Sequence, residues 1–322
     1  MRGLILVVFI FVFGCKEGHK KRTYKPASSG NINNLLVVTE NDLWNGRVGN
    51  AIRDYIGDEI YGLPQVEPHF DFNQVPNAVF SDFVRRNRIV LKVRTAADSS
   101  VKYYNDPYAS PQKMVVISGP NRDAQIELIK QNSGSIVSAL KDVEFSERQR
   151  RINKSLFNSK PIQDALNISI KFPSAYRIAK AEDQFFWIRR DTKTGSLNLL
   201  LYSLPLRGFE STESFSEYII STRDSIAQQH IPGPTDGNYM RTEMAYTPHF
   251  TETTMSGVSA LETRSLWKVE GAFMSGPFVN YCLKDETNGR FLVAEGFVYA
   301  PSQKKRDYMF ELETMIRSIS LK

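Results

Sequence analysis

The sequence predicts an α+β protein built in two parts, and three observations carry this prediction. Residues 33–150 alternate apolar runs, typical of buried strands, with helical segments. Residues 160–322 contain short strand-like runs joined by turns, with one helix among them and one at the end. That order is typical of an antiparallel sheet packed by helices. The chain has 322 residues, 41% of them hydrophobic, which is enough for two domains of ordinary size.

The first part is expected to contain three strands, over residues 35–39, 88–95 and 113–118. Residues 65–75 are interrupted by prolines and are predicted to be extended. A helix is predicted over 42–56, with Asn41 as its N-cap. Pro76 is placed to open another helix, because the apolar residues after it share one helical face: Val79, Phe80, Phe83 and Val84.

A long helix is predicted to end the first part. It begins near Asn121 and runs into the charged segment 144–151. We expect that segment to be a solvated helical end that bridges the two parts.

The second part is expected to be rich in strands. Four of them precede a helix over 214–229, at residues 168–172, 176–180, 185–190 and 197–204. Ser214 and Glu217 have the spacing of a capping box at the start of that helix. The loop 231–237, four more strands between 240 and 299, and a terminal helix over 305–319 complete the prediction.

The N-terminus has the pattern of a secretory leader. Arg2 precedes an apolar run over 4–13, which is too short to span a bilayer as a stable helix. The run ends in Val-Phe-Gly-Cys, which resembles the lipobox of bacterial lipoproteins, so we predict cleavage after residue 14 and lipidation of Cys15, including a palmitate-like acyl chain. An ordinary cleaved signal peptide with an incidental cysteine, or a buried first strand, is the alternative. Residues 15–32 are predicted to be a polar tether.

The net charge of +6 comes mostly from this tether, so the rest of the chain is nearly neutral. A neutral body gives no electrostatic footprint for nucleic acid. The lipid is therefore the expected link to the membrane, and the basic run 20–22 adds attraction to anionic headgroups. In the lipoproteins that this N-terminus resembles, export to the cell surface is associated with acidic residues right after the cysteine. Lys16 and Glu17 lead instead into that basic run, so the resemblance implies the periplasmic side of the outer membrane.

No motif for a common chemistry is present in the sequence. Phosphate-binding loops, nucleophile elbows and spaced metal ligands are absent, and no cofactor or metal is expected. Cys282 is the remaining thiol once Cys15 is lipidated, and strand alternation places it on the face opposite Val279, Tyr281 and Leu283. We interpret it as a structural thiol rather than a nucleophile.

Four residues are candidates for a ligand or partner cleft: Arg223, Tyr239, Trp267 and Phe278. Arg223 borders the apolar stripe of its helix and needs a carboxylate, from Glu243, from Glu262 or from a ligand. Tyr239 follows the turn at 232–237, Phe278 follows the turn at 276–277, and Trp267 is a candidate aromatic platform for a ligand. Structural roles are the alternative for each of them, an ion pair for Arg223 and core packing for Trp267.

Two resemblances follow from short motifs. The segment 168–178 (ISIKFPSAYRI), the hairpin and helix after it, and the terminal helix are similar to the PsbP-like α/β/α sandwich. The whole mature chain resembles an uncharacterised family of Bacteroidota lipoproteins. That resemblance rests on Gly62-Leu63-Pro64-Gln65, Ile231-Pro232-Gly233-Pro234, Ser265-Leu266-Trp267 and Met274-Ser275-Gly276-Pro277-Phe278. The family has no established activity, so the resemblance implies location and architecture only.

Two functional hypotheses remain open from the sequence. The first is a non-enzymatic envelope lipoprotein that binds an envelope protein. The second is an envelope hydrolase that acts on a glycan or a small molecule through carboxylates distant in sequence.

Overall fold

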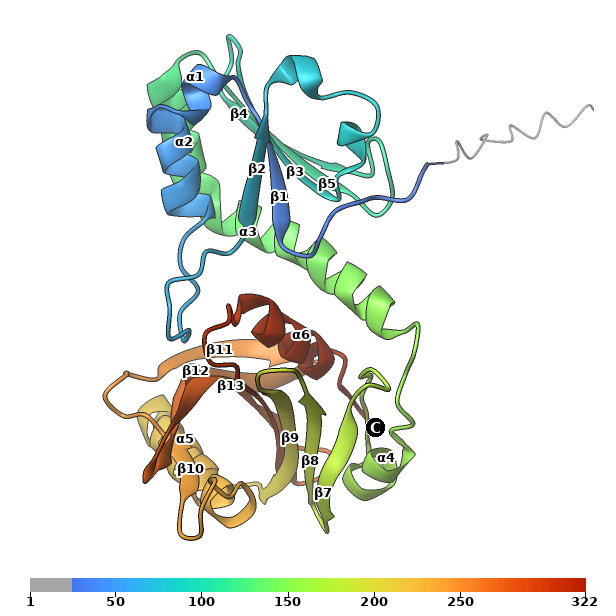
Figure 1. Ribbon diagram of the computed structural model, residues 1–322, viewed down its shortest axis with the longest axis vertical. Coiled ribbons are helices and arrows are strands. Elements are labelled where there is room, and N and C mark those ends of the chain that lie inside the picture. The colour runs from blue at the N-terminus through green and yellow to red at the C-terminus, as the bar shows by residue number, and fades with distance from the viewer. Residues whose placement is uncertain (1–24) are drawn as a thin grey trace, which may run out of the picture.

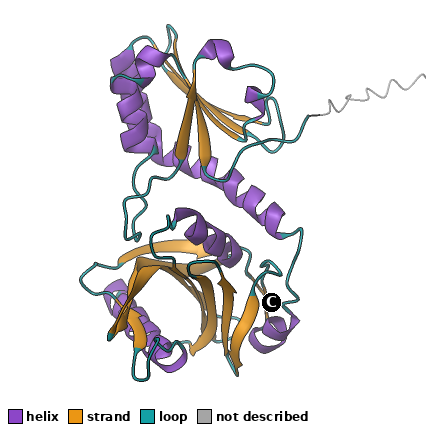
Figure 2. Ribbon diagram, in the orientation of Figure 1, coloured by secondary structure: helices purple, strands orange, loops and turns teal. Residues whose placement is uncertain are grey.

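The computed structural model describes residues 25–322, so the predicted leader and lipidation site at Cys15 lie outside the described residues. The chain forms a five-stranded and an eight-stranded sheet, each flanked by helices, and a small two-stranded one (Figures 1 and 2). This architecture confirms the predicted α+β class, with an antiparallel sheet in the second part. Within the described residues no helix is long and apolar enough to cross a membrane.

The N-terminal sheet has the strand order β2-β1-β3-β5-β4. Its strands are β1 (Asn34–Val38), β2 (Asp71–Val75), β3 (Ile89–Thr95), β4 (Ser100–Asn105) and β5 (Lys113–Gly119). All neighbours are parallel except β4, which runs antiparallel to β5. Apolar residues cover both faces of the central strands, as expected for a sheet buried on two sides.

The helix predicted over 42–56 is broken in the structure. It consists of α1 (Asn41–Trp44), α2 (Arg47–Ala51) and a π-helical turn (Ile52–Ile56), and the N-cap of α1 is Glu40 rather than Asn41. Gly46 separates α1 from α2 in an extended conformation, and a Cβ at this position would lie 2.8 Å from the Asp42 carbonyl oxygen. The chain bends at this glycine because nothing larger fits.

The helix predicted after Pro76 is also absent. Pro76 is extended, and two short 3-10 turns follow, Asn77–Val79 and Val84–Arg86. Asp82 separates them with a left-handed φ of 39°, which a continuous helix does not allow. Phe80 alone is fully buried against the sheet, whereas Val79 and Phe83 are exposed.

The long helix α3 (Arg122–Ile152) begins as predicted, because the Asn121 side chain accepts a hydrogen bond from the Ala124 amide at 2.9 Å. Its charged end is not solvated as expected. Glu144 is completely buried and binds Arg88, with Nε to Oε1 at 2.7 Å, and Glu147 is buried under two arginines of its own helix. Buried carboxylates need such partners, and sequence spacing alone does not reveal them.

The eight-stranded sheet of the second part is antiparallel and strongly curled (Figure 1). Its strand order is β10-β12-β13-β14-β9-β8-β7, with β11 also paired to β12. The strands are β7 (Arg177–Glu182), β8 (Phe185–Asp191), β9 (Ser196–Pro205), β10 (Tyr239–Thr242), β11 (His249–Met255), β12 (Val258–Glu270), β13 (Ala272–Asp285) and β14 (Arg290–Tyr299). The interval 240–299 therefore contains most of five strands rather than four.

Helices cover both faces of this sheet. They are α5 (Thr212–His230) on one face and α6 (Arg306–Arg317) on the other, with α4 (Lys160–Leu166) near the start of this part. The N-cap of α5 is Ser211, which exchanges hydrogen bonds with Ser214, so the predicted Ser214–Glu217 capping box is wrong. The strand predicted over 168–172 is shorter in the structure. It consists of β6 (Ile168–Ser169), which pairs with β15 (Ser320–Leu321).

The two parts contact each other through α3 and α6. Phe145 of α3 stacks on Phe310 of α6 with ring centroids 4.2 Å apart, and Arg148 forms an ion pair with Glu311. The Glu67 carboxylate accepts hydrogen bonds from the backbone amides of Lys305 and Arg306 at the start of α6, at 2.7 and 3.0 Å. The start of α6 is thereby held by a residue of the first part.

Candidate functional site

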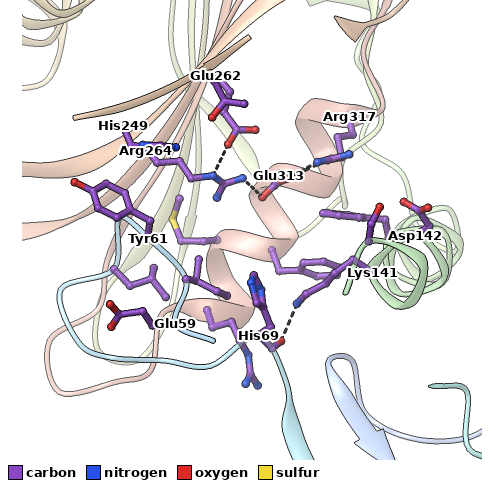
Figure 3. A pocket seen from close by; sticks show the side chains of 18 residues that line it. Glu59, Tyr61, His69, Lys141, Asp142, His249, Glu262, Arg264, Glu313 and Arg317 are labelled. Carbon is purple, nitrogen blue, oxygen red and sulfur yellow. Dashed lines mark hydrogen bonds and ion pairs between the residues drawn. The ribbon is translucent and has the colours of Figure 1, made fainter. Parts of the chain in front are cut away.

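A pocket of about 450 Å³ opens between the two parts (Figure 3). The segment 59–69 and α3 line it from the first part, and β11, β12 and α6 line it from the second. Lys141 and Phe145 project from α3, Arg264 from β12 and Glu313 from α6. The pocket is thus assembled from residues far apart in sequence, which only the packing of the two parts brings together.

A buried ionic cluster forms the wall of the pocket on the C-terminal sheet. Arg264 binds Glu262 at 2.5 Å and Glu313 at 2.8 Å, and Arg317 binds Glu313 from one turn further along α6 at 2.9 Å. The Tyr281 hydroxyl donates to Glu262 at 2.6 Å and is 3.1 Å from Glu313. Burial alone would raise the pKa of Glu313, but the two arginines outweigh it and lower that pKa to about 2.

Lys141 lies on the opposite wall of the pocket. Its ammonium donates to the Asn33 side-chain oxygen and the His69 carbonyl oxygen, both at 2.8 Å, and lies over the rings of Phe70 and Phe310. Desolvation, with repulsion from Arg306, lowers the pKa of Lys141 to about 7. In its charged form the ammonium has three protons and these two acceptors, which leaves one proton for a ligand.

His69 lies beside Lys141. Burial and the nearby Lys141 lower the pKa of His69 to about 4, so its ring is neutral at physiological pH. Its Nδ1 atom is buried and has no hydrogen-bond partner among residues 25–322. An unsatisfied buried nitrogen is uncommon, and this one has almost no accessible surface.

Tyr61 supplies an aromatic edge to the pocket. It is 42% exposed, and its ring packs near Tyr246 and His249 at centroid distances of 5.1 and 5.2 Å. On the facing wall, the Arg317 guanidinium lies 4.3 Å from the ring centre of Phe145. The opening of the pocket is therefore aromatic, and its interior is ionic.

The four residues proposed from the sequence do not meet around one opening. Arg223 is a buried residue of α5 and binds the Glu295 carboxylate at 2.9 to 3.1 Å, rather than Glu243 or Glu262. Phe278 lies under the same guanidinium, 4.0 Å from Arg223 Cζ to the ring centre. Tyr239 lines a separate open pocket with His230, and Trp267 is almost fully buried. This geometry favours the ion-pair interpretation of Arg223 and the core interpretation of Trp267.

Cys282 is buried in the core under α5, and burial raises its pKa well above the usual value. Val279, Tyr281 and Leu283 pack in the core on the α6 side, as strand alternation predicts. A thiol without a lowered pKa is a poor nucleophile, which favours the structural interpretation. Among residues 25–322, no three histidine, cysteine or acidic side chains cluster as a metal site.

The residues of the interdomain pocket were missed by sequence reasoning. A usable signal was present for two of them, because Glu313 and Arg317 have the i, i+4 spacing of a helical ion pair within an apolar terminal helix. Glu262 and Arg264 are likewise two residues apart and therefore share one strand face. No local pattern points to His69 or Lys141.

Fold and site define a two-part α+β protein with a pocket at the junction. Residues 155–318 match the family model described as Domain of unknown function (DUF4837), which spans half of the chain, and the chain belongs to that family. Residues 28–153 match a second model, Domain of unknown function (DUF8532). Membership in a Bacteroidota lipoprotein family and the similarity to PsbP-like proteins stay predictions.

Similarity to solved structures is weak. The Saccharomyces cerevisiae Ran-binding protein Mog1p is 10% identical, with 48% of this chain and 89% of that chain covered and a TM-score of 0.32. LpqN, involved in cell envelope biogenesis of Mycobacterium tuberculosis, is 11% identical, with 48% and 82% covered and a TM-score of 0.29. No curated protein matches the chain.

Proposed function

We propose that this protein is a lipoprotein held at the outer membrane through Cys15, facing the periplasm, whose body binds an envelope protein without catalysing a reaction. The leader and the Val-Phe-Gly-Cys sequence support the anchor. The pocket between the two parts supports the binding role, and we assign the partner's contact to it.

The pairing of charges inside the pocket carries this proposal. Glu262, Glu313, Arg264 and Arg317 neutralise one another, so the ionic wall is rigid and already satisfied before anything binds. What remains for a partner is the aromatic edge at Tyr61 and the spare proton of Lys141. This combination suits a short segment that offers an apolar side chain and a carbonyl or carboxylate oxygen.

The hydrolase alternative has one observation in its favour, because Glu262 and Glu313 are two carboxylates that line one pocket and contact the same tyrosine hydroxyl. A general acid, however, needs a raised pKa so that it carries a proton at neutral pH. Arg264 binds both carboxylates, and the pKa of Glu313 is about 2. The pairing therefore opposes acid catalysis by Glu313 and supports the binding role instead.

The anchor is tested by the mass of the mature protein from the membrane fraction. We expect loss of residues 1–14 and an acylated Cys15, and a Cys15→Ser chain that leaves the membrane fraction. A water-soluble wild-type protein with a different mature N-terminus would contradict the anchor.

The binding role is tested by placing a photo-crosslinking amino acid at position 61 in living cells. Position 273 is the matched control, because Phe273 is an exposed aromatic on the C-terminal sheet outside the pocket. We expect one stoichiometric envelope partner from position 61 and none from 273. Equal crosslinking from both positions would contradict the assignment to the pocket. Turnover of an envelope glycan by the purified body, without a partner, would favour the hydrolase.

A further inference from the structure

A patch of exposed apolar, aromatic and cationic side chains lies on the first part, away from the interdomain pocket. We call it the tether-exit patch, and it consists of Lys25, Val79, Phe83, Arg85, Arg86 and Tyr108. Phe83 is 65% exposed and Val79 is 48% exposed, which are high values for large apolar side chains. Such a cluster on a protein surface usually marks an interaction site.

The local backbone explains why these side chains face outward. Phe80 is buried against the sheet, whereas Val79 and Phe83 are exposed. Asp82, with its left-handed φ, changes the direction of the chain between the two 3-10 turns. The Arg85 guanidinium lies 5.1 Å from the ring centre of Tyr108 and 5.9 Å from that of Phe80. The patch is therefore held in place by Phe80 below and Arg85 across it.

The first described residues of the chain run directly along this patch. The Ser29 amide donates to the Arg86 carbonyl at 2.8 Å, and the Ser110 amide donates to the Pro26 carbonyl at 2.9 Å. Lys25 contacts the backbone of Asp106, two residues before Tyr108. In Figure 1 the chain enters the fold on the same side as the turns that follow β2. The N-terminal segment thus leaves the body at the patch itself.

Chain length limits how far the patch can lie from an anchor at Cys15. Nine residues lie between Cys15 and Lys25, and the ten steps from one Cα to the next span at most about 36 Å when fully extended. The contacts of residues 25–29 tie the body to that short segment at the patch. If Cys15 is lipidated, this surface lies within about 36 Å of the anchor.

The charge of the patch complements an anionic lipid surface. Lys25, Arg85 and Arg86 form no salt bridge with any residue between 25 and 322, and Asp82 is the single acid of the segment 76–88. Cations of this kind attract acidic headgroups, and an aromatic ring with an apolar neighbour favours the bilayer interface.

We propose that the tether-exit patch lies on the bilayer that holds the Cys15 lipid, with Phe83 and Val79 at the interface and the three cations against anionic headgroup phosphates. This inference rests on the proposed lipid anchor. It adds that the body is oriented on the membrane, with the second part and the interdomain pocket directed away from the bilayer.

The test uses the full-length lipidated protein in vesicles of phosphatidylethanolamine with 30% phosphatidylglycerol as probe. An environment-sensitive fluorophore is attached to Phe83→Cys in one sample and to Phe273→Cys in another. Cys282 is buried and does not compete for the label. We expect a blue shift and quenching by brominated lipid at position 83 only. Because the mass of each sample reports Cys15 acylation, failure of the anchor is seen separately from failure of the orientation.

A second arm tests the charges with the non-lipidated body. We expect Lys25→Gln/Arg86→Gln to bind the same vesicles about 25-fold more weakly, at about fivefold per charge. Lys130→Gln/Lys154→Gln is the matched control, since both lysines are exposed and neither belongs to the patch, and it is expected to bind more tightly than the patch variant. Three results would overturn the proposal: an acylated protein whose position 83 stays solvent-exposed, equal weakening by both double variants, or a label at 83 that responds to envelope proteins but not to vesicles.

Discussion

Removing one partner of the buried pair between Arg223 and Glu295 is expected to destabilise the second part strongly. Both side chains are essentially inaccessible to solvent, and the guanidinium makes three contacts of 2.9 to 3.1 Å with the carboxylate. In an Arg223→Met chain, Glu295 keeps only the Asn280 amide at 3.0 Å as a hydrogen-bond donor. Loss of one partner from such a pair typically costs about 3 to 5 kcal/mol.

Urea unfolding measures this loss. With a slope of about 2 to 3 kcal/mol/M, the midpoint is expected to fall by about 1 to 2 M. Trp187 and Trp267 both lie in the second part and report its unfolding by fluorescence. The control is the double variant Arg223→Met/Glu295→Leu, which removes both charges and is expected to recover most of the lost stability. A midpoint for Arg223→Met within 0.3 M of wild type, as an order of magnitude, or a double variant worse than the single one, would refute this reasoning.

Four further predictions follow from the same structure. Stability is expected to rise with pH between about 7 and 10, because folding lowers the pKa of Lys141 from its ordinary value of 10.5 to about 7 and the unfolded chain therefore binds more protons in that range. In urea titrations at several pH values, a Lys141→Met chain should lack this rise. Gly276→Ala should destabilise by about 2 kcal/mol or more, since its Cβ would lie 2.0 Å from the Val298 carbonyl oxygen. Gly208→Ala is the control, because a Cβ there meets no atom within 4 Å, and equal melting temperatures for the two variants would contradict this prediction. Cys282 should react with a thiol reagent only as fast as the body unfolds, and rapid labelling of the native protein would show that it is accessible. Phe145→Ala should loosen the contact with Phe310 and increase proteolytic cleavage within 153–159, and unchanged cleavage would show that the stacked rings do not hold the parts together.

Sequence patterns predicted those elements whose side chains alternate or repeat regularly. β9 and β14 are long apolar strands, and α3 starts near Asn121, as predicted. β4 was missed because it is a polar strand at the edge of the sheet, with its last four residues exposed. Its sequence therefore lacks the alternation of apolar and polar residues that indicates a strand. The helix after Pro76 was predicted only from the spacing of its apolar residues. The left-handed conformation of Asp82, which interrupts the helix, cannot be recognised from the sequence.

The candidate site was hardly predictable from the sequence. Lys141 and Glu313 come from helices more than 170 residues apart, and their pKa values depend on burial at a junction that exists only after both parts fold. Arg223 was correctly expected to need a carboxylate. Its partner Glu295 was not identified, because β14 is brought beneath α5 by sheet order rather than by sequence distance.

The N-terminal segment has a mechanical consequence through Asn33. Its backbone amide donates to Glu144 of α3 at 2.8 Å, and its side-chain amide donates to Asp307 of α6 at 2.9 Å. Tension applied to the N-terminus is first carried by residues 25–29, which are hydrogen-bonded to the first part. A force that separates these residues from the first part next reaches Asn33, where it loads both parts at one residue.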